Sequence, residues 1–426
     1  MTLTRFDTIA SNALRSIFLV VLAGAFSAAH SQTFDTLYSF TGTPDGSGIG
    51  QSNLLDINGT LYGTTSFGGV YGFGTIFKVT SSGKETVLYS FTGGADGASP
   101  SSGLTRDKSG NLYGTTLTGG DLNCSIINGF PPGCGVAYKF DENGLTPLYA
   151  FTDAADGAIP QGLVLDAAGN LYGPAFYGGV TQGCPLGSIG CGVIFELSPQ
   201  GSGWSESVLY SFKGGADGGV PNGFITRDAA GNLYGGASIG GNVADCSGPG
   251  CGVIFKIGTN HKETVLYAFK GGADGDQPNG SLLMDGKGNI YGTAYAGGDL
   301  SCSGDGFAVG CGVVFELTAA GKEVAVHTFK GPDGANPTYG LAVDSKGNGY
   351  GTTIYGGSSS FGTVFEVTSK GVETVLHNFT GGADGGYPSS GLIVDSQGAF
   401  YSNTAEGGDL SCSPPYGCGT VFKIVP

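Results

Sequence analysis

Short runs of apolar, β-branched and aromatic residues recur along the chain, and each run is bounded by Gly, Asn or Asp. The stretch 74–114 shows the complete set, in which GTIFKV, ETVLYSF, GLTRD and NLYG follow one another with turn residues between them. Runs of this length and composition are typical of β-strands joined by tight turns. No stretch after residue 31 has a helical periodicity of useful length, so we expect an all-β protein.

The set of four strand segments recurs seven times. The phenylalanine that closes the fourth segment marks each copy, and it stands at Phe40, Phe91, Phe151, Phe212, Phe269, Phe329 and Phe379. A period of 50 to 61 residues indicates stacked supersecondary units. Four strands per unit in seven units predict a seven-bladed β-propeller with four antiparallel strands per blade.

The two ends of the chain indicate how the ring closes. The segment 33–40 is a fourth strand without a preceding third, and the chain ends on a third strand at 419–424. We therefore expect the N-terminal strand to complete the last blade. A β-solenoid is the alternative fold, and it would leave both of these strands unmatched.

The first 31 residues have the pattern of a signal peptide. Arg5 and Arg15 precede or flank a short apolar segment, 16–26, and small residues lead to an expected cleavage site after Ser31 or Ala29. No later stretch is long and apolar enough to cross a membrane. We expect a chain exported to the periplasm or the extracellular space, in which residues 32–426 form a single monomeric domain.

The ten cysteines fall into five close pairs in the same slot of their units. These are Cys124/Cys134, Cys184/Cys191, Cys246/Cys251, Cys302/Cys311 and Cys412/Cys418. The first and sixth units lack both members, as disulfides within one loop require. Each bond would stabilise its loop by roughly 2–3 kcal/mol through chain entropy. Zinc is the alternative, but it would need four ligands gathered in one place.

The repeated unit has about a dozen fixed offsets. Written as GTVFKVT-x-x-G-x-E-x-VLYSFTGG-x-DG-x-x-P-x-x-GL-x-x-D-x-x-GNLYGTT-x-x-GG, it resembles the GloVer tandem repeat of exported bacterial proteins. The resemblance covers nearly the whole of residues 32–426. It implies an exported repeat protein of uncharacterised activity, and it supplies no catalytic residues.

Charge narrows the range of partners. The net charge is −16, and charged residues make up only 12% of the chain, against roughly 25% in typical domains. Nucleic acid is therefore excluded as a partner, because phosphate binding needs a basic face. The same charge disfavours attraction to an anionic membrane surface.

Loop lengths distinguish the two faces of the predicted ring. One face, here called the turn face, carries the D-x-x-G-N turns and the SSGK-type turns, which are nearly constant in length. The other, the loop face, carries the GGADG-x-x-P crossings between blades and the variable loops between second and third strands. Function concentrates on loops displayed by a rigid scaffold, so we expect it on the loop face near the central channel.

Each crossing contains an Asp-Gly pair. The aspartates are Asp45, Asp96, Asp156, Asp217, Asp274, Asp333 and Asp384. As a ring of carboxylates they could hold Ca²⁺, the one cofactor that the sequence leaves open. The alternative is that each Asp bonds its own turn, and no unit has the dense D-x-D-x-D-G pattern of a calcium loop.

Aromatic residues stand at the variable loops. Those before the loops are Phe67, Tyr177, Tyr295 and Tyr355, and those within them are Tyr71, Phe130, Phe307 and Tyr416. Their rings could stack on sugars, because aromatic faces give a large contact area at low entropic cost. The alternative is packing within the loops.

Acidic residues that do not recur in every unit are the candidates for catalysis. Glu406 replaces an aromatic, aliphatic or small residue, and Asp121, Asp299 and Asp409 follow Gly-Gly in three units. Glu406 and Asp409 would form a glycosidase pair if their carboxyls lay roughly 5–9 Å apart. Asp121 and Asp299 are also candidates for ligand binding. The alternative for all four is that they are solvated loop acids.

The histidines do not indicate nucleophilic or metal-dependent catalysis. His327 and His377 occupy the slot that holds tyrosine in the other five units, and no Gly-x-Ser-x-Gly motif is present. The sequence therefore favours a non-catalytic binding propeller with polysaccharide as ligand. The alternatives are a polysaccharide lyase or glycoside hydrolase, and an envelope scaffold that binds another extracellular protein.

Overall fold

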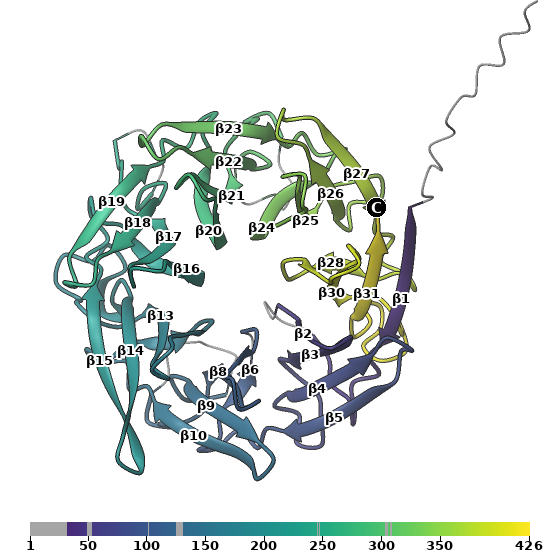
Figure 1. The fold of residues 1–426 in the computed structure, drawn as a ribbon, viewed down its shortest axis with the longest axis horizontal. Coiled ribbons are helices and arrows are strands. Elements are labelled where there is room, and N and C mark those ends of the chain that lie inside the picture. Colours follow the sequence, from purple (N-terminus) through teal and green to yellow (C-terminus); the bar gives the residue numbers. More distant parts are fainter. Residues whose placement is uncertain are drawn as a thin grey trace, which may run out of the picture. The chain divides into compact units, whose positions relative to one another are not determined.

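The computed structural model describes residues 32–48, 53–100, 102–124, 131–244, 246, 248–302, 306 and 309–426. These residues form seven antiparallel sheets arranged as blades around a common axis (Figure 1). The one helical element among them is a short 3-10 helix, η1 (Gly187–Ile189). The predicted seven-bladed propeller is confirmed.

Each blade has an inner, a second, a third and an outer strand. The inner strands, some of them in two pieces, are β2 (Leu55–Ile57), β6 (Ala98–Pro100) with β7 (Thr105–Arg106), β11 (Ala158–Pro160) with β12 (Val164–Leu165), β16 (Gly219–Arg227), β20 (Asp276–Met284), β24 (Ala335–Val343), and β28 (Gly386–Pro388) with β29 (Ile393–Val394). The second strands are β3 (Thr60–Thr65), β8 (Leu112–Thr118), β13 (Leu171–Tyr177), β17 (Leu233–Ile239), β21 (Ile290–Ala296), β25 (Gly349–Tyr355) and β30 (Phe400–Glu406).

The remaining strands form the outer half of each blade. The third strands are β4 (Thr75–Thr80), β9 (Val136–Asp141), β14 (Val193–Gln200), β18 (Val253–Ile257), β22 (Val313–Leu317), β26 (Thr363–Val367) and β31 (Thr420–Val425). The outer strands are β5 (Glu85–Ser90), β10 (Gly144–Ala150), β15 (Gly203–Ser211), β19 (Glu263–Ala268), β23 (Glu323–Thr328), β27 (Glu373–Asn378) and β1 (Thr33–Ser39).

Ring closure joins the two ends of the chain in the seventh blade. β1 pairs antiparallel with β31, in a register that runs from Thr33 opposite Val425 to Ser39 opposite Thr420 (Figure 1). The N-terminal strand is thus the outer strand of the last blade, as predicted. β1 thus covers the edge of β31 and ties the two ends of the chain into one sheet.

Neighbouring blades are held together by the phenylalanine that marks each unit. All seven are fully buried, and each packs edge-on against the third-strand ring of the following blade. The ring centroids lie 5.0 Å apart for Phe40 and Phe77, and 4.9 Å apart for Phe151 and Phe195. Such edge-to-face pairs add about 0.5–1.5 kcal/mol beyond the area that they bury.

The glycine of the LYG segment makes room for these rings. A Cβ placed on Gly63 would lie 2.7 Å from Cζ of Phe77, and one on Gly292 would lie 2.7 Å from Cζ of Phe315. Glycine is therefore required wherever the third-strand ring lies across the second strand. The recurring motif reflects packing.

The predicted signal peptide, 1–31, lies outside the described residues and stays a prediction. Within the residues described, no helix has the length and apolar character needed to cross a membrane.

Candidate binding face

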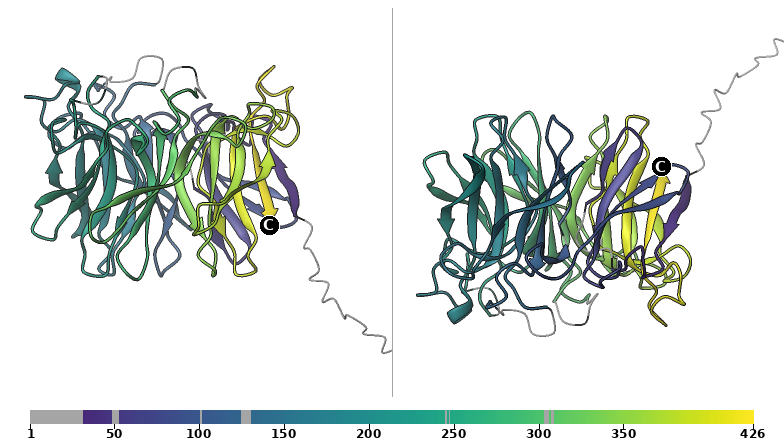
Figure 2. Two further views of the ribbon diagram at one scale, coloured as in Figure 1. Left: turned by 90° about the horizontal axis from the view of Figure 1, so that it is seen from above. Right: turned by 90° about the horizontal axis from the view of Figure 1, so that it is seen from below.

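The two faces of the ring differ in the way that loop lengths predicted. Seen edge-on, one side carries short regular turns and the other carries longer loops (Figure 2). On the turn face, Asp107 accepts hydrogen bonds from the backbone N–H groups of Ser109 and Asn111, from the Asn111 amide and from the Tyr113 hydroxyl. Burial alone would raise the pKa of Asp107, but the hydrogen bonds from Asn111, Tyr113 and Ser109 together outweigh it and hold the pKa below its usual value.

On the loop face, all five predicted disulfides are present. They join Cys124 to Cys134, Cys184 to Cys191, Cys246 to Cys251, Cys302 to Cys311 and Cys412 to Cys418. A Cβ on Gly214 would lie 2.5 Å from the Cys191 sulfur, and one on Gly42 would lie 2.8 Å from that of Cys412. Each disulfide therefore supports the crossing that leads to the next blade.

The two units without cysteines use phenylalanine in the same place. Phe73 and Phe361 precede the glycine that opens the third strand, as the second cysteine does elsewhere. A Cβ on Gly93 would lie 2.7 Å from the Phe73 ring, and one on Gly381 would lie 2.5 Å from the Phe361 ring. Sequence reasoning missed this substitution, although the shared Phe-Gly and Cys-Gly dipeptides could have shown it.

The recurrent Asp-Gly aspartates each bond within their own crossing. Asp96 accepts hydrogen bonds from the Tyr89 hydroxyl and from the backbone and side chain of Thr92. A tyrosine hydroxyl donates to the aspartate at four other crossings, in the pairs Tyr38–Asp45, Tyr149–Asp156, Tyr210–Asp217 and Tyr267–Asp274. At the last two crossings a histidine contacts the aspartate, in the pairs His327–Asp333 and His377–Asp384. These contacts match the turn-building interpretation, and calcium binding stays a prediction.

One crossing departs from the pattern. Asp153 stands where Gly93 stands in the preceding crossing, and its φ is 63°. Its Oδ1 is buried without a hydrogen-bond partner beside the Cys124–Cys134 disulfide. Burial and the charge of Asp156 raise the pKa of Asp153 to about 6.

The acids that follow Gly-Gly form local turns. Asp121 accepts from the backbone and amide of Asn123, Asp299 from Ser301, and Asp409 from Ser411. The hydrogen bonds from the two serine side chains lower the pKa values of Asp299 and Asp409. These three carboxylates therefore already have partners within their own loops.

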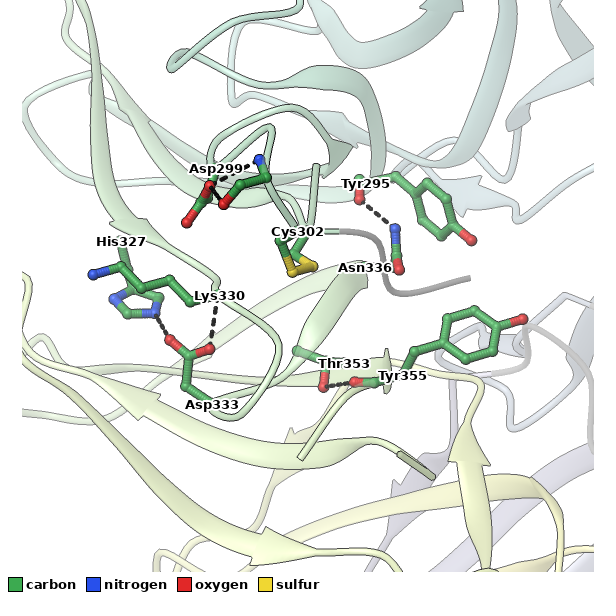
Figure 3. The surroundings of a disulfide bond; sticks show 11 residues. Tyr295, Asp299, Cys302, His327, Lys330, Asp333, Asn336, Thr353 and Tyr355 are labelled. Atoms are coloured by element: carbon green, nitrogen blue, oxygen red, sulfur yellow. Dashed lines mark hydrogen bonds and ion pairs between the residues drawn. A yellow bond between two sulfur atoms is a disulfide. The ribbon is translucent and has the colours of Figure 1, made fainter. Parts of the chain in front are cut away.

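The predicted aromatic residues lie in different environments. Phe67, Tyr71 and Tyr416 are exposed, with 44%, 59% and 60% of their surface accessible. Tyr177 is half-buried and packs against Phe176. Tyr295 and Tyr355 lie on adjacent blades with their rings pointing the same way (Figure 3). Phe130 and Phe307 lie outside the described residues.

One of these side chains, Tyr355, has an aromatic contact across the junction of blades six and seven. Tyr387 packs against Tyr355 and Phe361, with ring centroids 5.4 and 5.2 Å apart. Burial raises the pKa of Tyr387, and the nearby Glu406 carboxyl and Tyr416 hydroxyl add to the effect. We call these five residues the Tyr387 cluster.

Sequence reasoning named Tyr355, Glu406 and Tyr416 separately but missed Tyr387, which brings them together. Tyr387 has a φ of 52°, and the equivalent residues Ser99, Ile159, Val220, Gln277 and Asn336 have φ values of 54–57°. A positive φ is uncommon for residues other than glycine, and its recurrence here makes it part of the repeated scaffold, on which this unit carries a tyrosine. The Tyr387 N–H donates to the Phe361 carbonyl, which holds this backbone in place.

Inner strands of different blades approach one another closely at the centre of the ring. The Phe224 ring on β16 lies against Gly162 in the third blade and Gly103 in the second. A Cβ on Gly162 would lie 2.0 Å from the ring, and a Cβ on Gly103 would lie 3.0 Å from it. Gly223 likewise meets the backbone of Gly280. The candidate site is therefore the Tyr387 cluster at a blade junction.

The chain matches the family described as the Gloeobacter/Verrucomicrobia repeat three times, over residues 24–179, 126–307 and 300–426. These matches agree with the resemblance seen in the sequence. No curated protein matches the chain.

Solved structures resemble the fold. The extracellular domain of a hybrid two-component system from B. thetaiotaomicron is 12% identical with a TM-score of 0.53, over 92% of this chain and 41% of that one. This chain thus spans less than half of that protein. A gluconolactonase from Xanthomonas campestris is 13% identical (TM-score 0.43, 93% of this chain and 90% of that one). Aldose sugar dehydrogenase from Streptomyces coelicolor is 12% identical (TM-score 0.45, 76% and 93%). Such low identities show the fold alone.

Proposed function

Because the chain belongs to the Gloeobacter/Verrucomicrobia repeat family and folds as a closed propeller, we propose that it is an exported, non-catalytic module that binds polysaccharide on its loop face. The observation that carries this proposal is the Tyr387 cluster. In it the Tyr387 ring packs against the rings of Tyr355 and Phe361, and the Glu406 carboxyl and the exposed Tyr416 are near enough to act on the Tyr387 hydroxyl.

The chemistry of this cluster suits a sugar chain. Aromatic faces cover the apolar face of a pyranose ring, while phenol and carboxyl groups bond its hydroxyls. The net charge of −16 favours a neutral or cationic polysaccharide over an anionic one. Because the cluster spans two packed blades, its rings are held in position before the ligand arrives, which lowers the entropic cost of binding.

Export supports the same reading. The segment 1–31 has a signal-peptide pattern, and five disulfides form in oxidising compartments. We place the protein in the periplasm or outside the cell, where polysaccharides are available as ligands.

One observation favours a second candidate, a glycoside hydrolase or lyase. Burial raises the pKa of Glu406, as suits a general acid. Its expected partner Asp409 is half-buried and accepts hydrogen bonds from Ser411. The test below therefore also measures polysaccharide cleavage. It also distinguishes the third possibility, an envelope scaffold that binds another protein.

The test is retention of the chain from Gln32 onward on a panel of immobilised polysaccharides, with Ca²⁺ or a chelator, while new chain ends are assayed. We expect retention without cleavage. Tyr387→Ser should weaken retention by about tenfold, a loss of about 1.4 kcal/mol. Ser99 adopts the same backbone conformation in the second blade, so this variant should keep the fold.

Tyr71→Ala is the control, since Tyr71 is an exposed loop aromatic outside the Tyr387 cluster. It should bind as the unaltered chain does. If the chain produced new polysaccharide ends and Glu406→Gln did not, the binding-module proposal would be wrong and the protein would be an enzyme. An absence of both retention and cleavage would leave the scaffold as the supported reading.

A further inference from the structure

The perimeter of the ring carries a repeated cluster of acidic groups where one blade meets the next. The outer strand of each blade lies along the perimeter (Figure 1). Five outer strands carry a half-buried glutamate six residues before the phenylalanine that marks the unit, and these are Glu85, Glu206, Glu263, Glu323 and Glu373. Each has a buried Oε1 without a hydrogen-bond partner.

These glutamates face the crossing aspartate of the preceding blade. Burial and the charge of Asp45 raise the pKa of Glu85 to about 7, and Asp217 acts on Glu263 in the same way. At four of the five junctions the aspartate also accepts a hydrogen bond from a tyrosine, as in the Tyr38–Asp45 pair. A neutral tyrosine is a poor metal ligand, so these four junctions offer only two carboxyls.

The junction of blades five and six is different because histidine replaces tyrosine. His327 Nε2 lies 3.1 Å from Oδ2 of Asp333, and this contact is seen in Figure 3. The ligand atoms of His327, Asp333 and Glu373 all lie within 4.8 Å of one another. All three side chains are half-buried, so an ion there would be partly shielded from water.

The second substituted histidine supplies an internal comparison. His377 also lies 3.1 Å from its crossing aspartate, Asp384. In this junction, however, Phe34 occupies the glutamate position and stacks on the imidazole, with ring centroids 3.7 Å apart. His377 therefore has one carboxylate beside it, whereas His327 has two.

We propose that His327, Asp333 and Glu373 form a binding site for a divalent transition-metal ion, with Zn²⁺ as the best match. One imidazole and two carboxylates are ligands that zinc accepts, and water would complete the tetrahedron. With both carboxyls ionised and the imidazole neutral the site carries a charge of −2, which the ion neutralises. Because Glu373 belongs to β27 and the other ligands to β23 and the crossing after it, the ion would join two blades.

Zinc bonds to nitrogen and oxygen are about 2.0–2.2 Å long, so tetrahedral ligand atoms lie about 3.4 Å apart. The His327–Asp333 contact, at 3.1 Å, is already close to this separation. The Glu373 carboxylate lies within 4.8 Å of the other two ligand atoms, and its unpartnered Oε1 has no hydrogen bond to give up on approaching the ion.

The test is titration of the untagged chain from Gln32 onward with ZnCl₂ by calorimetry, together with elemental analysis after dialysis and a thermal melt. We expect one zinc per chain and a higher Tm with zinc. His327→Tyr introduces the residue found in five other units, and Glu373→Leu introduces the residue found as Leu145. Each variant removes a zinc ligand. Zinc binding should therefore weaken by more than the roughly 10–100-fold that is lost when a residue that only holds a ligand in place is replaced.

His377→Tyr is the matched control and should keep both the stoichiometry and the zinc-dependent Tm rise. Two results would overturn the proposal: no zinc bound at micromolar concentration, or binding that persists unchanged in His327→Tyr. Parallel titrations with Mn²⁺ and Ca²⁺ decide the ion class, and a preference for Ca²⁺ over Zn²⁺ would also contradict the proposal.

Discussion

The turn face and the loop face are built on the same principle and yet differ in what they allow. Both carry one recurrent aspartate per unit that is bonded within its own turn, such as Asp107 on the turn face and Asp96 on the loop face. The turn face adds little to this framework. The loop face adds a support under each crossing and a displayed residue beside it. The comparison teaches that recurring polar residues build the scaffold, and that departures from the repeat mark the candidate sites.

Removing the supports of the loop face should have the largest effect. Five disulfides close loops with sequence separations of 5 to 10 residues, and each is worth roughly 2–3 kcal/mol. Reduction should therefore lower the unfolding midpoint in denaturant strongly. Because the turn face has no disulfide among its described turns, hydrogen exchange should rise first in the loop-face crossings.

A single unit can refine this test. Cys184→Ser with Cys191→Phe reproduces the Phe73 arrangement and should recover part of the stability that Cys184→Ser with Cys191→Ser loses. Equal stability of the two double variants would show that phenylalanine does not support the crossing. A midpoint that is insensitive to reductant would contradict the role given to the disulfides.

The two recurrent aspartates should respond alike. Asp107→Ala leaves the N–H groups of Ser109 and Asn111 unpartnered, and Asp96→Ala leaves those of Thr92 and the Tyr89 hydroxyl unpartnered. We expect each to lower the free energy of unfolding by about 2 kcal/mol, as measured by denaturant titration. If Asp96→Ala kept its stability but lost a calcium-dependent activity, the loop-face aspartates would be ligands and the two faces would differ in kind.

The repeat allowed much of the fold to be predicted. Period and strand order gave the seven blades, the pairing of the first strand with the last, the two faces and the five disulfides. These features follow from spacing within one unit. The role of the Asp-Gly aspartates was also within reach, because Asp and its Thr partner stand four residues apart.

The candidate sites depend on contacts between units, which spacing does not reveal. Tyr387 meets Tyr355 across a blade junction, and Glu373 meets Asp333 across another. Which side chains meet there depends on blade twist and on a positive φ at Tyr387. The sequence therefore indicated the loop face and several members of the Tyr387 cluster, but not the residue that joins them.

The turn face itself has one incomplete unit, and filling it should give the smallest effect. Gly349 opens β25 where the other units have Leu61, Leu112, Leu171, Leu233, Ile290 and Phe400. A cavity of about 260 Å³ lies beside it, lined in part by Leu341, Val343 and Val367. A Cβ on Gly349 would lie 3.5 Å from Cδ1 of Leu341, an ordinary contact, and its φ is not positive.

Gly349→Leu should therefore place an isobutyl group in this cavity and raise the free energy of unfolding by about 1 kcal/mol, through apolar burial and a better strand residue. The thermal midpoint measures this gain. Gly351→Leu is the matched control two residues away, where a Cβ would lie 2.5 Å from Cζ of Phe365, so that variant should be destabilised. If Gly349→Leu also lowered the midpoint, the cavity would not accept a leucine side chain and the prediction would be wrong. The turn face would then tolerate substitution as poorly as its regularity suggests.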